Sequence, residues 1–112
     1  MNAKMETLDM LLGARDTLTG WIVELSPQDP DQNRELQKLL QRRDRITGLV
    51  QSVIEAAFKE ATSGLAEAVA NLEKATDQLG GLQQTLDNIG RAIAFTDNVI
   101  QMATNALKIA MC

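Results

Sequence analysis

The side chains that most often carry catalysis or hold metals are scarce in this 112-residue chain. It contains no histidine, and its one cysteine, Cys112, is the last residue. Histidine is the commonest general base and metal ligand, and structural zinc sites need several thiolates or imidazoles. The glycine pair Gly80-Gly81 also lacks the Lys-Ser/Thr that completes a phosphate-binding loop. We therefore expect a non-catalytic protein without a metal site or a cofactor.

The acidic residues of the chain suit structural roles better than chemical ones. Asp29 and Asp31 flank Pro30 and could touch a cation. However, aspartate before a proline is typical of a helix start, where its carboxylate caps free N–H groups. Further acidic residues are expected on a solvated helix face: Glu55, Glu60, Glu67 and Glu73.

A basic stripe is the strongest candidate for a binding site. Arg34, Lys38, Arg42 and Arg45 follow one another at steps of four, four and three, which places them on one exposed helix face. Such a stripe can lie along phosphates or anionic lipid headgroups. No aromatic residue interleaves it, so stacking on single-stranded nucleic acid is unsupported. We favour a solvated face that pairs with acidic residues, and we keep anion binding as the alternative.

These residues must be positioned by helices, because the composition is that of a helical protein. Hydrophobic residues make up 45% of the chain but aromatic residues only 3%, so the core must consist of aliphatic side chains. The clearest stretch is 30–79, which contains no internal proline. It predicts one helix of roughly 75 Å, at ~1.5 Å per residue. The apolar residues that define its stripe include Leu36, Leu39, Ile46, Val50, Val53, Ala57, Ala61, Leu65, Ala68, Leu72, Ala75 and Leu79.

Two further helices are predicted on either side of this central one, over residues 3–25 and 82–111. Pro27 ends the first helix, and Asp29, Pro30 and Gln32 have the pattern of a capping box that begins the second. Gly80-Gly81 is expected to reverse the chain in a tight turn, which would place Leu65 opposite Thr96. The sequence thus predicts an all-α, coiled-coil-like single domain built on a long antiparallel hairpin of three helices.

The last helix has an apolar arc too wide for one neighbour to cover. Beside its main stripe it carries two more apolar columns, which form the predicted interface: Ala92, Phe95, Val99, Met102, Ala106 and Ile109. Either the chain folds back on itself by breaking near Gly64, or a second chain supplies the missing cover. We favour the second chain, with the central helix at most bent at Thr62-Ser63-Gly64. The expected state is a homodimer that completes a helical bundle.

The combined pattern predicts a self-associating protein-interaction or assembly module, such as an adaptor, a chaperone or a structural subunit. A helical segment of another protein is a further possible partner for the apolar arc. The alternatives are nucleic-acid or anionic-surface binding through the basic stripe, and a membrane-active helical protein. The net charge of −4 and the charged residues that interrupt the last helix disfavour both nucleic acid and membrane as partners. Because the N-terminal stretch lacks the basic and then apolar pattern of a secretory signal, we expect a cytoplasmic protein, with export by a signal-independent route as the alternative.

Overall fold

The chain forms a four-helix bundle in a computed structural model that describes residues 2–111. The bundle measures 49 × 23 × 16 Å, and the described residues contain no strand. The all-α class is therefore as predicted, whereas the single rod of roughly 75 Å is not. The elements are α1 (Ala3–Glu24), α2 (Pro30–Glu55), α3 (Leu65–Gly80), the short 3₁₀ helix η1 (Leu86–Asn88) and α4 (Ile89–Met111).

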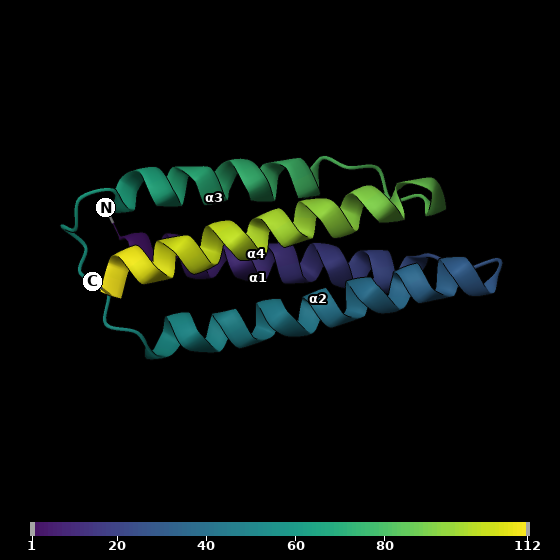
Figure 1. Cartoon of the computed structure of the whole chain (residues 1–112), viewed down its shortest axis with the longest axis horizontal. Helices are drawn as coiled ribbons and strands as arrows, with labels where there is room; N and C mark the ends of the chain where they lie inside the picture. Colours follow the sequence, from purple (N-terminus) through teal and green to yellow (C-terminus); the bar gives the residue numbers. More distant parts are fainter. Residues whose placement is uncertain (1, 112) are drawn as a thin grey trace.

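The four helices pack in a rhombus, with α1 and α4 between α2 and α3 (Figure 1). Around its edge α1 contacts α2, α2 contacts α4, α4 contacts α3, and α3 contacts α1. Consecutive helices run antiparallel, so α2 and α4 run in the same direction, as do α1 and α3 (Figure 1). Because α2/α4 and α1/α3 are opposite edges of the rhombus, these two seams lie on opposite sides of the bundle.

The first turn agrees with its sequence signals. Helix α1 ends at Glu24, and α2 begins at Pro30 with Asp29 as its N-cap. The Asp29 carboxylate accepts a hydrogen bond from the backbone N–H of Gln32 at 2.9 Å. The Gln32 side chain returns to the N–H of Gln28, one residue before the expected cap, at 2.6 Å. Local side-chain chemistry is thus sufficient to start α2 where the sequence predicts it.

The prediction of a continuous central helix over residues 30–79 is wrong. Helix α2 ends at Glu55, residues 56–64 reverse the chain, and α3 begins at Leu65. Gly64 has φ +86°, in the left-handed region that glycine adopts without steric cost. The structure therefore has the alternative that the sequence left open, a chain folded back near Gly64.

The reversal at 56–64 is held by residues far away in the sequence. The Lys4 ammonium donates to the carbonyl oxygens of Ile54 at 3.0 Å and Ala56 at 2.7 Å. The Glu60 carboxylate accepts from the backbone N–H groups that begin α1, and the N–H of Lys59 donates to Ala110 at 2.9 Å. The bonds to Ile54, Ala56 and Lys59 satisfy backbone groups that a continuous helix would have paired internally, and Glu60 satisfies N–H groups left free at the start of α1.

The predicted start of the last helix at Leu82 is also wrong, because α4 begins at Ile89. The intervening segment is closed locally, since the Asn88 side-chain amide donates to the carbonyl of Gln83 at 3.0 Å. The longer connection shifts the pairing of α3 with α4. Leu65 packs with Ala110 and Val69 in a small buried cluster, and not opposite Thr96 as a tight turn would require.

Candidate charged groove between α2 and α4

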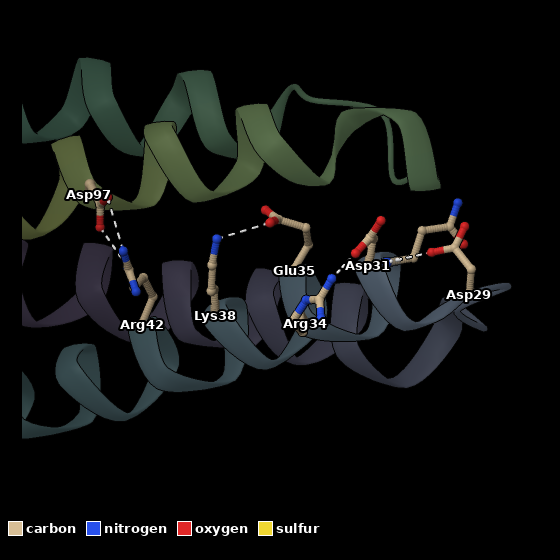
Figure 2. Close-up of polar contacts among 8 residues, drawn as sticks. Asp29, Asp31, Arg34, Glu35, Lys38, Arg42 and Asp97 are labelled. Atoms are coloured by element: carbon tan, nitrogen blue, oxygen red, sulfur yellow. Dashed lines mark hydrogen bonds and ion pairs between the residues drawn. The ribbon is translucent and has the colours of Figure 1, made fainter.

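The predicted basic stripe lies along α2, but the structure divides it into two parts. Arg34 pairs with Asp31, and Lys38 pairs with Glu35 at 3.0 Å, each within one turn of α2 (Figure 2). Arg42 instead reaches across to α4, where its Nε donates to Asp97 at 2.8 Å (Figure 2). The stripe is therefore neutralised locally at Arg34 and Lys38, and it is joined to a second helix at Arg42.

The Arg42–Asp97 pair ties α2 to α4. A second, longer contact joins Nη2 of Arg42 to the other carboxylate oxygen of Asp97 at 3.5 Å. The hydrogen bonding to Asp97 and the negative charge of Asp97 together raise the pKa of Arg42 above its ordinary value, and burial opposes them with a smaller effect. The guanidinium therefore remains charged at any pH at which the protein would be handled. The side chains are 26% and 48% exposed, so the pair is a partly screened surface link.

Beside this pair lies an open groove of about 500 Å³ between the parallel helices α2 and α4. Arg45 is exposed on one wall and Lys108 stands on the other, with Ile100 as an apolar lining residue. The remaining lining residues are mostly polar and uncharged: Gln101, Thr104 and Asn105. Three cations and the single carboxylate of Asp97 give this α2/α4 groove a net positive charge. Among the ion pairs of the described residues, none involves Arg45.

Sequence reasoning found Arg42 and Arg45 but missed Lys108. Lys108 reaches the groove because α4 runs parallel to α2, with Asp97 level with Arg42. That register depends on the reversal at 56–64 and on the start of α4 at Ile89. A tight hairpin could not have placed Asp97 level with Arg42. Of the predicted anion-binding residues, Arg34 and Lys38 do not line the groove.

The residues of the predicted interface face largely inward. Ala92, Val99 and Ala106 are fully buried, because α1, α2 and α3 cover the wide apolar arc of α4 within one chain. The other members are half-buried: Phe95, Met102 and Ile109. The fold thus removes the uncovered strip from which the dimer was inferred. Self-association itself stays a prediction.

The opposite seam has the opposite charge. A groove of about 370 Å³ between α1 and α3 is lined by Met10, Val69 and Thr76 together with four exposed carboxylates. The carboxylates are those of Glu6, Asp9, Glu73 and Asp77. None of them takes part in an ion pair among the described residues. Sequence reasoning missed this groove, because it assigned Glu73 to a solvated face and expected no contact between α1 and α3.

The two aspartates that could have touched a cation, Asp29 and Asp31, serve in a helix cap and an ion pair. Asp29 caps α2, and Asp31 pairs with Arg34. Over residues 2–111, no group of three or more His, Cys, Asp or Glu side chains is arranged to hold a metal ion. Cys112 lies outside the described residues.

Comparisons with models of protein families, with curated proteins and with solved structures give no significant match. No helix of residues 2–111 is both long enough and apolar enough to cross a membrane.

Proposed function

We propose that the chain is a non-catalytic protein-interaction or assembly module that binds an acidic protein surface through the α2/α4 groove. The observation that carries this proposal is the placement of Arg45 and Lys108 on the two walls of an open groove, next to Arg42, which pairs with Asp97. Separate cations on two walls can contact carboxylates spread along a helix or a loop. Ile100 adds an apolar contact at the same site.

Nucleic-acid binding through the full basic stripe has less support. A stripe that follows a phosphate backbone needs several cations free to replace counterions. Arg34, Lys38 and Arg42 are already paired with Asp31, Glu35 and Asp97. A phosphate backbone would have to compete with three carboxylates of the chain itself. An acidic protein surface needs only the groove.

A peptide titration tests this proposal. The probe is a fluorescent peptide of Glu, Ala and Leu that forms an acidic amphipathic helix, and binding is followed by anisotropy at low salt. We expect the double variant Arg45→Glu with Lys108→Glu to lose about tenfold or more in affinity, since attraction becomes repulsion at two sites. The matched control, Arg34→Glu with Lys38→Glu, makes the same charge change on α2 outside the groove and should bind almost as well as the unmodified protein.

Two results would contradict the proposal. The first is that the peptide fails to bind at low salt. The second is that duplex DNA of equal charge binds more tightly than the peptide and loses affinity equally in both double variants. That second outcome would favour nucleic-acid binding along the whole stripe.

A further inference from the structure

The occupant of the basic groove can be deduced from the acidic groove on the other side of the bundle, if the proposed function is taken as the starting point. The α1/α3 groove has Met10 and Val69 among its lining residues and carries four exposed carboxylates. The α2/α4 groove has Ile100 among its lining residues and carries three cations and one carboxylate. The two grooves are thus complementary in charge, and each has an apolar component.

The carboxylates of the acidic groove lack an ion-pair partner among residues 2–111. Four like charges gathered over two neighbouring helices repel one another, and such repulsion costs free energy unless cations approach. In the α2/α4 groove, by contrast, Asp97 already offsets Arg42. The carboxylates Glu6, Asp9, Glu73 and Asp77 have no ion-pair partner among the described residues. A cationic surface from outside the molecule would relieve this repulsion.

We infer that the acidic α1/α3 groove of one copy docks on the basic α2/α4 groove of a second copy. The two grooves cannot meet within one molecule, because they lie on opposite faces of the rhombus. Between copies, carboxylates of the acidic groove approach Arg45 and Lys108, while the apolar residues of both grooves become covered. The occupant is therefore the same chain.

The positions of the grooves also determine the symmetry of the assembly. A two-fold dimer through either groove would place like charges against each other, which opposes association. Contact between unlike grooves is heterologous, and it leaves one groove free on each end copy. Copies accordingly add head to tail, and the assembly grows beyond a dimer as concentration rises.

Charge-swap complementation tests this pairing. One variant carries Asp9→Lys with Glu73→Lys, which cancels the net negative charge of its α1/α3 groove while its α2/α4 groove stays basic. The other carries Arg45→Glu with Lys108→Glu, so that both of its grooves are acidic. We expect each variant alone to be monomeric by light scattering at low salt, with association weakened about tenfold or more. An equimolar mixture should associate again, because the unchanged basic groove of the first variant can dock on the unchanged acidic groove of the second.

Matched controls separate the grooves from the net charge. The control for the acidic groove is Glu24→Lys with Glu67→Lys, which makes the same change of net charge at exposed sites outside that groove. The control for the basic groove is Arg34→Glu with Lys38→Glu, which makes the same change of net charge on α2 outside that groove. Both controls should associate like the unmodified protein when the salt is the same. Circular dichroism verifies folding. If a reversal of charge prevents folding, two neutral variants replace it: Asp9→Asn with Glu73→Gln, and Arg45→Gln with Lys108→Gln. Each of them should still weaken association.

Three results would overturn the inference. They are no association of the unmodified protein, association that survives either swap, and a mixture that stays monomeric. The peptide titration is independent of all three. If the peptide binds through Arg45 and Lys108 while the swap experiment fails, the groove recognises an acidic protein other than this one, and only the self-pairing is wrong.

Discussion

The two parallel seams of the bundle differ in how far the chain neutralises its own charge. In the α2/α4 groove, Asp97 bonds Arg42 at 2.8 Å and links the two helices. In the α1/α3 groove, four carboxylates stand without an ion pair among the described residues. The first groove therefore gains some stability from its charges, whereas the second loses some. A surface kept at a cost to folding indicates a role outside the isolated fold, and the role we propose is contact with cations of another copy.

The largest expected effect on stability comes from two buried threonines, one with a hydrogen-bonded hydroxyl group and one without. Thr7 on α1 is fully buried and its hydroxyl has no hydrogen-bond partner, whereas the buried Thr96 on α4 donates to the carbonyl of Ala92 at 2.6 Å. We expect Thr7→Val to raise the free energy of unfolding by about 1 kcal/mol, because it removes an unsatisfied polar group. Thr96→Val should lower it or leave it unchanged. Urea denaturation of both variants measures the difference, and equal shifts would show that the unpaired hydroxyl of Thr7 does not reduce stability.

Removing one carboxylate from each groove should give smaller effects of opposite sign. Asp97→Ala is expected to lower the free energy of unfolding by about 0.5 kcal/mol, because Arg42 loses its cross-helix partner. Glu73→Ala is expected to raise it by roughly 0.3 kcal/mol at low salt, because it relieves like-charge repulsion. Both shifts should shrink as salt is added. If Glu73→Ala proved as destabilising as Asp97→Ala, the acidic groove would not be the uncompensated one.

The distance along the chain between interacting residues explains which parts of the fold the sequence predicted. The turn before α2 was predicted because Pro27, Asp29 and Pro30 act within a few residues of one another. The reversal at 56–64 was missed because the apolar spacing continues in phase from Val53 through Ala57 and Ala61 to Leu65. In the structure Ala57 and Ala61 are exposed.

The bonds that interrupt the central helix come from the far ends of the chain. Lys4 and Glu60 connect residues more than fifty positions apart, a separation at which periodicity carries no information. The candidate site depends on the same bonds. Arg42 and Arg45 could be selected from helical spacing alone. Lys108 lines the basic groove, and the acidic groove exists, only because α3 and α4 fold back along α1 and α2.

Sedimentation velocity of the unmodified protein, across a range of protein concentration, tests the pairing of unlike grooves most directly. At ~20 mM salt, where charges on facing surfaces are weakly screened, we predict a mass that rises from the 12.2 kDa monomer past the dimer without a plateau. At about 0.5 M salt the same samples should sediment as monomers. A monomer at every concentration in low salt would contradict the account, as would a dimer plateau that persists in high salt.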